Sequence, residues 1–523
     1  MYTLKVHSDD ICQAFTSQTK AFLIDLLRET DIVIRKGCPG NGACGLCKIM
    51  IIEGKTNALT ESEKLHLNHT QLRNGIRLAC QVVLQGNLEI KLIDTQSSNH
   101  WQFKSSEHKK SGQEVISPVG IAVDLGTTHI RLSIVCLKTG KSLSKGYCLN
   151  PQVPYGSDIM TRLQSADESV KIAQKMCNTT LDTIGEGIWR SCLETGMTLK
   201  AIEKIAIVGN TAMIALLTGE RYHELLQPEN WARYVDLSFS HEDQWKTLWG
   251  LSENVEINII PSLSGFVGSD LLAGIISTNL KQENKKKMLV DFGTNSEIAL
   301  WDSSTLWITS AAGGPAFEGS GMSCGIPAEK GAIYQTAIDH ESIAYKVIGQ
   351  ISPRGICGSG TVDLIADLLR LGIVLPTGRF IKSNPPYYEI LKEKNDTIKL
   401  TKADIDLFQR AKSAVATGIF CLVKQAGISF SELDTLYIGG AFGGVLDIRK
   451  AIAVGLIPPV NPDKVLIVED MALKGCEKIL MDSKWHEQID AIKGKANPLN
   501  LSRRDDFYDL FLQNLYLTVL SGD

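Results

Sequence analysis

The feature that most constrains the fold of this chain is an apolar strand that ends in an acidic glycine turn, which occurs twice. Residues 121–128 read IAVDLGTT and residues 288–295 read MLVDFGTN. Such a turn offers backbone N–H and hydroxyl donors to phosphate oxygens, while Asp124 or Asp291 holds hydrated Mg²⁺. One Asp-Gly turn says little, because such turns close hairpins in many folds. Two copies in the same register predict a phosphate site built from both.

A third apolar strand runs into a glycine-rich turn, LYIGGAFGG at residues 436–444, for which a wide hairpin loop is the structural alternative. The common nucleotide loops are missing. The GKT at 54–56 and the GKS at 140–142 lack the glycine that a Walker A loop carries five residues earlier, where Ile49 and Val135 stand. No G-x-G-x-x-G loop clearly follows a strand, so a dinucleotide site has little support.

Together, the three turns resemble the phosphate-1, phosphate-2 and adenosine motifs of the superfamily of acetate and sugar kinases, Hsc70 and actin (ASKHA). The resemblance implies two ribonuclease-H-like lobes with ATP and Mg²⁺ between them. It assigns catalysis to Asp124, Asp291 and Thr127. The residues that it places around the phosphates are Asp124, Gly126, Thr127, Thr128, Asp291, Gly293, Thr294 and Asn295, and those facing the adenosine are Gly439, Gly440 and Gly443.

Four cysteines form a second pattern, C-x₅-C-x₂-C followed by one more, at Cys38, Cys44, Cys47 and Cys80. Iron–sulfur clusters need thiolate ligands, and glycines beside them let backbone N–H groups approach the sulfurs. The loop has glycines at positions 37, 40, 42 and 45. Zinc is the alternative, but zinc sites usually present two close pairs of ligands. Here three cysteines share one loop and the fourth stands alone.

The cysteine spacing, with the RLACQ at residues 77–81, resembles plant-type and especially adrenodoxin-type [2Fe–2S] ferredoxins. The resemblance covers about ninety residues. It implies a β-grasp fold in which the four cysteines hold a one-electron [2Fe–2S] cluster.

The expected fold class is multidomain α/β: a β-grasp ferredoxin domain plus a two-lobed ATPase. A polar, Ser- and Lys-rich stretch predicts a linker over residues 94–118, and the later alternation of short strands and helices is typical of α/β organisation. The charged residues 281–287 indicate a hinge between lobes, although an ordinary solvated turn fits as well. The predicted domains are residues 1–93 (ferredoxin), 94–118 (linker), 119–285 (first lobe) and 286–523 (second lobe).

Composition narrows the class of protein. A net charge of −4 over 523 residues provides no basic field for nucleic acid. The chain begins MYTLKVHSDD, which has acidic residues where a signal peptide needs an apolar core, and no stretch of about 18 apolar residues occurs. Thirteen cysteines cannot all pair, which favours metal ligation and thiols over disulfides. We expect a cytoplasmic protein without a membrane segment.

Taken whole, the chain resembles the reductive activators of corrinoid proteins. The matching phrases are NPQ at 150–152, YGSD at 155–158 with Arg162, VGNTAM at 208–213, SAAGGPAFEG at 310–319 and GICGSG at 355–360. The resemblance implies an ATP-dependent enzyme that passes one low-potential electron to the inactive Co(II) corrinoid of a partner protein and restores Co(I) for methyl transfer. An upstream electron donor is then required, and a homodimer through the ATPase domain is left open.

Two other functions share parts of this pattern. An activator of another radical or dehydratase enzyme would carry every motif above. A small-molecule kinase of the same fold would use Asp158 as a general base, although phosphoryl transfer has no need of a one-electron cluster. Cys324 and Cys357 fit either a second cluster at a dimer axis or buried thiols. Tryptophans 231, 245 and 249 fit either a partner surface or core anchors of an irregular segment.

Overall fold

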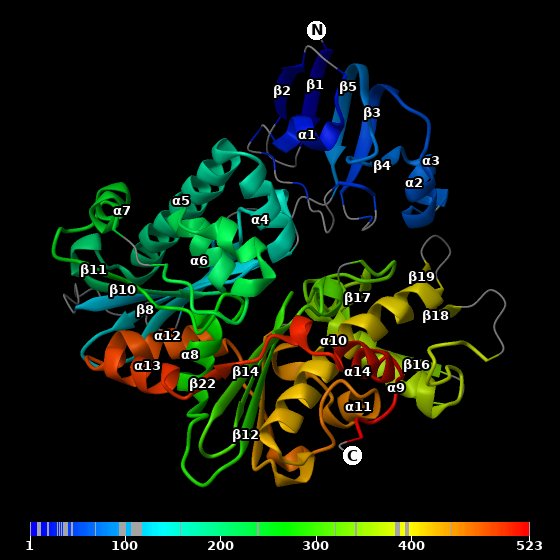
Figure 1. The fold of residues 1–523 in the computed structure, drawn as a ribbon. Coiled ribbons are helices and arrows are strands. Elements are labelled where there is room, and N and C mark those ends of the chain that lie inside the picture. The colour runs from blue at the N-terminus through cyan, green and yellow to red at the C-terminus, as the bar shows by residue number, and fades with distance from the viewer. Residues whose placement is uncertain are drawn as a thin grey trace.

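The structure is a computed structural model of the whole chain. It describes residues 2–7, 12–17, 20–28, 30, 32, 34, 40–42, 45, 47–67, 69–93, 101–105, 118–156, 158–237, 240–319, 321–339, 342–381, 387–392, 397–440 and 442–521. Figure 1 shows an N-terminal module above two larger α/β lobes.

The N-terminal module is a five-stranded sheet in the order β2-β1-β5-β3-β4. Strands β1 and β5 run parallel and the other neighbours antiparallel. Leu4 and Val6 of β1 point inward two residues apart, as a half-buried strand requires, and pack with Leu23 and Leu27 of α1. The predicted β-grasp fold is confirmed. Its elements are β1 (Tyr2–His7), β2 (Cys12–Ser17), α1 (Leu23–Arg28), β3 (Lys48–Thr56), α2 (Glu61–His66), α3 (His69–Arg73), β4 (Ile76–Leu78) and β5 (Leu84–Leu92).

The first lobe is built on a six-stranded sheet in the order β11-β10-β7-β8-β9-β6. Every residue of the central strand β7 is buried, because neighbouring strands flank it and helices cover the sheet. The elements are β6 (Gln102–Ser105), β7 (Val119–Leu125), β8 (His129–Cys136), β9 (Ser142–Leu149), α4 (Ile159–Glu168), α5 (Val170–Thr195), β10 (Ile202–Gly209), α6 (Thr211–Thr218), α7 (Glu242–Trp249) and β11 (Glu256–Ile259).

Part of the segment expected to be a linker belongs to this sheet. Strand β6 pairs antiparallel with β9. The indole of Trp101 is buried against α5 and donates a hydrogen bond of 2.8 Å to the carbonyl of Thr183. The structure thus ties residues 101–105 to the first lobe, while the domain boundaries stay a prediction.

The second lobe repeats the arrangement with a six-stranded sheet in the order β21-β20-β12-β13-β14-β22. Its sheet strands are β12 (Lys287–Phe292), β13 (Ser296–Trp301), β14 (Leu306–Ala311), β20 (Thr435–Gly440), β21 (Val465–Ile467) and β22 (Ala496–Pro498). Two smaller sheets follow β14, formed by β15 (Ala332–Asp339), β16 (Ser342–Val347) and β17 (Gly355–Ile356), and by β18 (Tyr387–Lys392) and β19 (Thr397–Thr401). The helices are α9 (Gly358–Arg370), α10 (Lys402–Ala426), α11 (Ile448–Ala453) and α14 (Phe507–Asn514).

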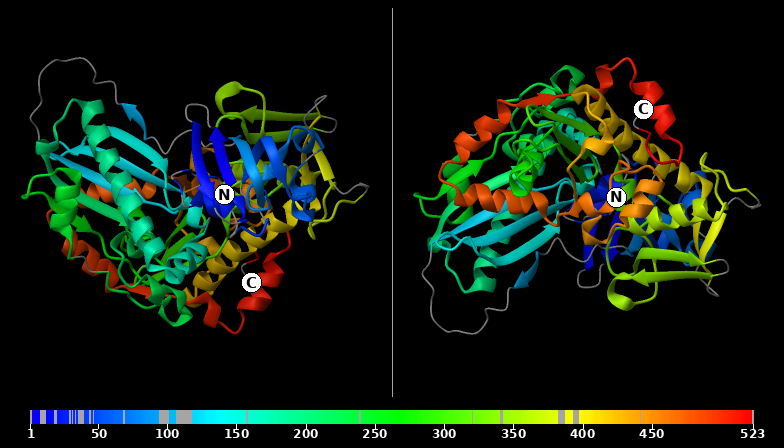
Figure 2. Two further views of the ribbon diagram at one scale, coloured as in Figure 1. Left: turned by 90° about the horizontal axis from the view of Figure 1, so that it is seen from above. Right: turned by 90° about the horizontal axis from the view of Figure 1, so that it is seen from below.

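Two helices join the lobes. Helix α8 (Ser269–Thr278) and helix α12 (Met471–Met481) pack on each other and share one apolar core with residues of both large sheets. That core includes Val208 from β10 and Leu289 from β12, together with Ile489 of α13 (Trp485–Lys493). Figure 2 shows the two lobes side by side, seen from above and from below. The predicted two-lobed ASKHA architecture is confirmed.

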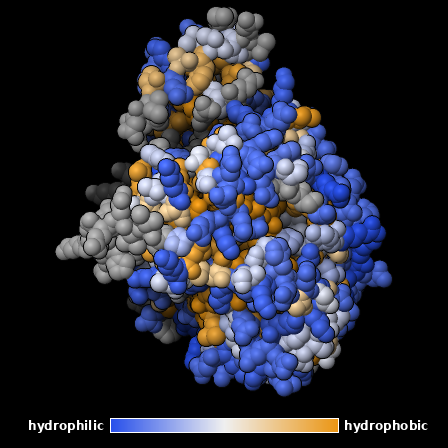
Figure 3. All heavy atoms as spheres, turned by 90° about the vertical axis from the view of Figure 1, so that its left-hand side faces the viewer, coloured by the Kyte–Doolittle hydropathy of each residue, from blue (hydrophilic) through white to orange (hydrophobic). Residues whose placement is uncertain are grey.

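A helix must be both long and apolar to cross a bilayer. None of the helices of the described residues combines these two properties. On the face shown in Figure 3, hydrophilic residues form most of the surface and hydrophobic ones gather toward its centre.

Candidate nucleotide and cluster sites

The two sheets bring the predicted aspartates to the ends of their central strands. Asp124 is the penultimate residue of β7 and lies opposite Arg131 in the antiparallel pair β7–β8. Asp291 holds the matching position in β12, opposite Glu297 of β13 and beside Gly439 of β20. The repeated sequence unit is therefore a repeated structural unit, once in each lobe.

The two hydroxyl turns face each other across the lobes. The Oγ1 atoms of Thr128 and Thr294 lie 3.5 Å apart, and both hydroxyls donate to the carboxylate of Glu318. The other predicted residues of these turns, Gly126, Thr127, Gly293 and Asn295, are partly exposed. Groups that sequence reasoning assigned to one phosphate site thus converge, with an additional carboxylate among them.

Carboxylates crowd this region. Burial raises the pKa of Asp124 to about 7 against the opposing charge of Arg131, and the charges of Asp270 and Asp470 add to the rise. Burial raises the pKa of Asp291 to about 7 as well, reinforced by Asp270 and Asp124. The excess of negative charge is the electrostatic signature of a site that receives a cation.

Two further acids lie behind the aspartates. Burial raises the pKa of Asp270, at the start of α8, and holds the pKa of Glu297 well above its usual range, to which the neighbouring Asp270 also contributes. The amide of Asn210 donates to Glu297 Oε1 at 3.0 Å. One proton shared by this pair would relieve the repulsion between them.

The cation nearest to Asp124 is Arg131. Its Nη1 lies 3.6 Å from Asp124 Oδ2, and its Nε lies 3.5 Å from Oδ1 of Asp470, the residue before α12. Sequence reasoning missed Arg131, Asp270, Glu297 and Glu318 as members of the site. The signal for Arg131 was available, since an arginine seven residues after Asp124 must lie opposite it if the turn closes a hairpin.

The glycine-rich turn after β20 lies against Asp291. Gly440 has φ = +85°, and a Cβ there would come within 2.5 Å of Asp291 Oδ1 and 2.0 Å of the Phe292 carbonyl. At Gly439 a Cβ would meet Met471 at 2.6 Å. Gly443 begins the short turn Gly443–Val445. Only glycine lets this turn approach the acidic strand end so closely.

Half of the predicted cluster ligands can be placed. Cys38 and Cys44 lie outside the described residues. The thiols of Cys47 and Cys80 are buried, and the backbone of Ala79 donates to the carbonyl of Cys47 at 2.8 Å, so both cysteines lie at one edge of the sheet. Among the residues that the structure describes, no three side chains of the metal-binding types form a group.

The loop before Cys47 is shaped for close contact. Gly42 and Gly45 have φ of +82° and +65°, and a Cβ at Gly45 would lie 2.6 Å from the ring of His66. The amide of Gln81 lies 3.6 Å from Cys80 Sγ. Two buried thiols beside a tight glycine loop and an amide donor fit a [2Fe–2S] cluster.

A buried ion pair supports this edge. Arg77 donates from Nε and Nη2 to the two oxygens of Glu63 at 2.7 and 2.9 Å, and the backbone of Leu78 donates to Glu63 Oε1 at 3.1 Å. Burial pushes the pKa of Glu63 up, but these hydrogen bonds together with one from Thr60 hold it below its usual value. The pair fixes the strand that leads to Cys80.

The remaining candidates take structural positions. Asp158 caps α4, accepting from the backbone of Thr161 at 2.9 Å. Trp245 and Trp249 are buried, and Trp231 donates to the carbonyl of Leu225. Cys324 and Cys357 are both buried free thiols.

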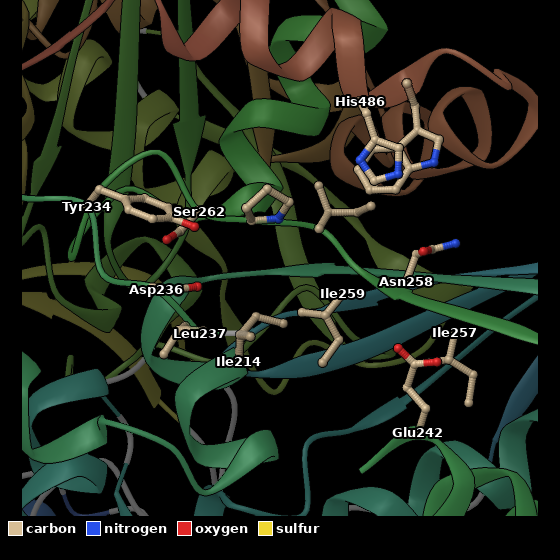
Figure 4. A pocket seen from close by; sticks show the side chains of 13 residues that line it. Ile214, Tyr234, Asp236, Leu237, Glu242, Ile257, Asn258, Ile259, Ser262 and His486 are labelled. Carbon is tan, nitrogen blue, oxygen red and sulfur yellow. The ribbon is translucent and has the colours of Figure 1, made fainter. Parts of the chain in front are cut away.

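A separate cavity of about 200 Å³ lies at the edge strand β11 (Figure 4). Ile214, Tyr234, Ser262 and His486 are among the side chains that line it, and none of the residues predicted for the nucleotide or the cluster does so. The two predicted sites are therefore built elsewhere.

The fold and these two sites define a class of protein: a ferredoxin-type iron–sulfur module on the same chain as an ASKHA domain. Three family models match the sequence. The 2Fe-2S iron-sulfur cluster binding domain matches residues 6–85, the RACo middle region residues 119–283, and the C-terminal ASKHA domain of RACo residues 285–521. The chain thus consists of a ferredoxin-type domain followed by the RACo middle region and the C-terminal RACo ASKHA domain.

Similar proteins agree with this assignment. The corrinoid activation enzyme RamQ of Eubacterium limosum is 29% identical over 422 residues, which span 76% of this chain and 70% of that protein. The [Co(II) methylated amine-specific corrinoid protein] reductase of Methanosarcina barkeri is 26% identical over 433 residues, 76% of each chain. A solved reductive activator for corrinoid,iron-sulfur protein shares the fold with a TM-score of 0.66 and 24% identity over 99% of both chains.

Proposed function

We propose that this chain is an ATP-dependent reductive activator that delivers one low-potential electron to the Co(II) corrinoid of a partner protein and so restores Co(I) for methyl transfer. The observation that carries the proposal is the union, on one chain, of a ferredoxin module with two opposed phosphate turns whose threonine hydroxyls lie 3.5 Å apart. The relatives named for corrinoid activation and reduction support the choice of partner.

Cys38, Cys44, Cys47 and Cys80 are the proposed cluster ligands. A [2Fe–2S] cluster held there supplies a one-electron reductant. The chain's own contribution is to bury the thiols of Cys47 and Cys80 and to place the Gln81 amide 3.6 Å from Cys80 Sγ, where a donor stabilises the additional negative charge of the reduced state. The Glu63–Arg77 pair keeps the edge carrying Cys80 in place.

Asp124 and Asp291 are proposed to hold hydrated Mg²⁺ between the lobes, with Thr127, Thr128, Thr294 and Asn295 and the glycines of their turns on the phosphates of ATP. Gly439, Gly440 and Gly443 would face the adenosine. Burial, reinforced by neighbouring carboxylates, raises the pKa of both aspartates, and this supports the division because a bound divalent cation offsets both effects. Because the two lobes belong to one chain, they can close on the nucleotide while the partner protein is bound.

Coupling to ATP answers an energetic need. A deficit of about 60 mV costs about 1.4 kcal/mol for one electron, so a reduction that is uphill by a few hundred millivolts requires a driven conformational step. Lobe closure can supply such a step only if the two conformations bind the partner differently.

The deciding experiment mixes the reduced protein with a Co(II) corrinoid protein and follows the Co(I) absorption with and without MgATP. We expect Co(I) only when ATP is present and none with Asp291→Ala. Stimulation of ATP hydrolysis by a dehydratase component instead of the corrinoid protein would favour the other class of activator. Phosphorylation of a small acceptor without any corrinoid effect would identify a kinase, for which Asp158 is already engaged as a helix cap.

Three finer points complete the proposal. A separate electron donor must reduce the chain again after each transfer. We propose the cytoplasm as the compartment, since no cysteine in the described part of the chain forms a disulfide, as reducing conditions favour. Homodimerisation through the ATPase domain is proposed as the assembly state, which light scattering of the full chain tests directly.

A further inference from the structure

We propose that Glu318 is the general base of ATP hydrolysis, the group that takes a proton from the water attacking the γ-phosphate. The inference rests on the proposed function, since it assumes that ATP occupies the cleft between the two phosphate turns.

The position of Glu318 relative to the turns is the first argument. Its Oε1 and Oε2 accept from Thr128 Oγ1 at 3.3 and 3.2 Å, and Oε2 also accepts from Thr294 Oγ1 at 3.0 Å. One carboxylate therefore touches the hydroxyl of each predicted phosphate turn, one from each lobe. Asp124 and Asp291 lie at the strand ends instead. The site thus has Asp124 and Asp291 for the metal and a separate carboxylate, Glu318, beside the threonine hydroxyls of the turns.

Two other acids of the site are held by groups outside the two turns. Glu297 is buried and receives the amide of Asn210, and Asp270 receives the backbone N–H of Leu271. Glu318 itself is partly exposed, whereas Glu297 is buried.

The surrounding charge suits a base. Arg162 is wholly buried; its Nε donates to the Gly156 carbonyl at 2.8 Å, and its Nη2 has no hydrogen-bond partner among the described residues. Burial raises the pKa of Glu318, while the hydrogen bonds from Thr294 and Thr128 and the charges of Arg131 and Arg162 oppose the rise. The result is a carboxylate that is more basic than a surface glutamate and whose protonation nearby cations oppose.

The step is balanced. The water oxygen forms a bond to the γ-phosphorus, the bond from that phosphorus to the β,γ-bridging oxygen breaks, and ADP leaves with the electron pair. Glu318 accepts the water proton and later releases it to solvent. The threonine hydroxyls that Glu318 now holds are free to turn to the phosphates once ATP is bound.

The test uses the full chain with its cluster, without any corrinoid protein, so that it reads ATP hydrolysis alone. Glu318→Gln keeps the size and the hydrogen-bonding oxygen but removes the base. We expect single-turnover hydrolysis to slow by about 100-fold or more, the usual range for a general base. The Kd of a fluorescent ATP analogue should stay within about threefold. Glu329→Gln, which removes a more exposed carboxylate nearby in the sequence, is the matched control and should hydrolyse ATP at the wild-type rate.

A second readout separates a base from a structural contact between the lobes. Glu318→Ala should regain turnover when formate is added, because a small carboxylate can replace a missing base but not a missing contact. A loss smaller than tenfold in Glu318→Gln, or weaker nucleotide binding with turnover preserved, overturns the inference. If the Gln variant fails to fold, Glu318→Asp, which retracts the carboxylate, should slow turnover at unchanged Kd. Absence of Co(I) formation by the wild-type protein would sink the corrinoid function and leave this measurement intact.

Discussion

The two predicted sites handle buried charge in opposite ways. In the ferredoxin module, the buried carboxylate of Glu63 accepts from both arms of Arg77 and from the backbone of Thr60 and Leu78, at 2.7 to 3.1 Å. In the cleft between the lobes, Asp124 and Asp291 share the influence of one arginine, whose closest carboxylate contact is 3.5 Å. The pKa of Glu63 is held below its usual value, whereas the pKa values of Asp124 and Asp291 are both raised to about 7.

This difference in the balance of charge distinguishes a structural ion pair from a group of residues that can bind a ligand. A fully hydrogen-bonded ion pair needs no ligand and keeps its geometry whatever binds elsewhere. A group of carboxylates without enough positive charge stores unfavourable energy that a cation releases, so part of the binding energy is built into the unliganded fold. We therefore expect the ferredoxin edge to keep its geometry with or without metal, and the carboxylates between the lobes to respond to a bound cation.

The largest effect is expected from a substitution that removes the cluster and leaves the proposed nucleotide site unchanged. Cys47→Ser removes one of the buried proposed ligands, so the visible absorption and the reduced-state EPR signal should disappear. Nucleotide binding should be retained, because the two sites lie in different modules. Cys12→Ser, at an exposed cysteine of β2, is the control and should keep both signals. Iron content unchanged in Cys47→Ser would refute the ligand assignment.

The second prediction is that a substitution in the proposed nucleotide site leaves the cluster intact. Asp291→Ala should lower ATP hydrolysis by about 100-fold or more, since the carboxylate is proposed to position hydrated Mg²⁺, while the cluster stays reducible. A phosphate-release assay with parallel dithionite titration measures both. Asp509→Ala, on the exposed face of α14, should behave as wild type. Unchanged turnover in a folded Asp291→Ala protein would show that the second turn does not serve the phosphates.

The third prediction concerns the fully hydrogen-bonded ion pair of Glu63 and Arg77. Glu63→Gln leaves Arg77 buried with its charge uncompensated, which should cost about 3–5 kcal/mol. Urea titration followed by loss of cluster absorption measures it. Glu61→Gln on the same helix removes only an exposed pair with Lys64 and should cost less than about 1 kcal/mol.

The same pair predicts acid sensitivity. Because the pKa of Glu63 is held below its usual 4.5, the stabilisation is fully present above that pH and is lost as the pH falls through the lowered value. Equal urea midpoints for Glu63→Gln and Glu61→Gln would mean that the pair does not hold this edge.

Local repetition explains what the sequence could reveal. Asp124 and Asp291 were predictable as partners because each follows the same strand pattern, and two such turns in register belong to one architecture. The β-grasp fold was expected because the cysteine spacing and the RLACQ at residues 77–81 resemble those of [2Fe–2S] ferredoxins. The roles of these residues stay predictions, as do Cys38 and Cys44, which lie outside the described part of the chain.

Long-range packing explains what the sequence could not reveal. Glu318 lies in a short turn with no periodic pattern, and only the approach of the lobes brings it to Thr128, 190 residues away. Asp270 joins the site because α8 packs between the sheets. Trp101 and β6 fall in a polar stretch whose composition gives no sign of pairing with β9. In each case the contact depends on tertiary structure, which overrides local composition.

The smallest expected effect tests the stored repulsion directly. The folded pKa of Asp124 is raised from 3.8 to about 7, so its stabilising contribution is present only at low pH and is lost as the pH rises through about 7. At pH 8, in EDTA and without nucleotide, Asp124→Asn should therefore stabilise the lobes, by about 1 kcal/mol or a few degrees in Tm. The gain should shrink toward pH 5, where the folded wild-type carboxyl is itself protonated. MgATP should reverse the order, because the wild-type carboxylate then gains its cation and the amide does not. Asp509→Asn controls for the change in net charge, and calorimetry at both pH values with and without MgATP provides the comparison. A destabilised Asp124→Asn at pH 8 without ligand would mean that the contact with Arg131 outweighs the repulsion, and the contrast between the two regions would fail at this residue.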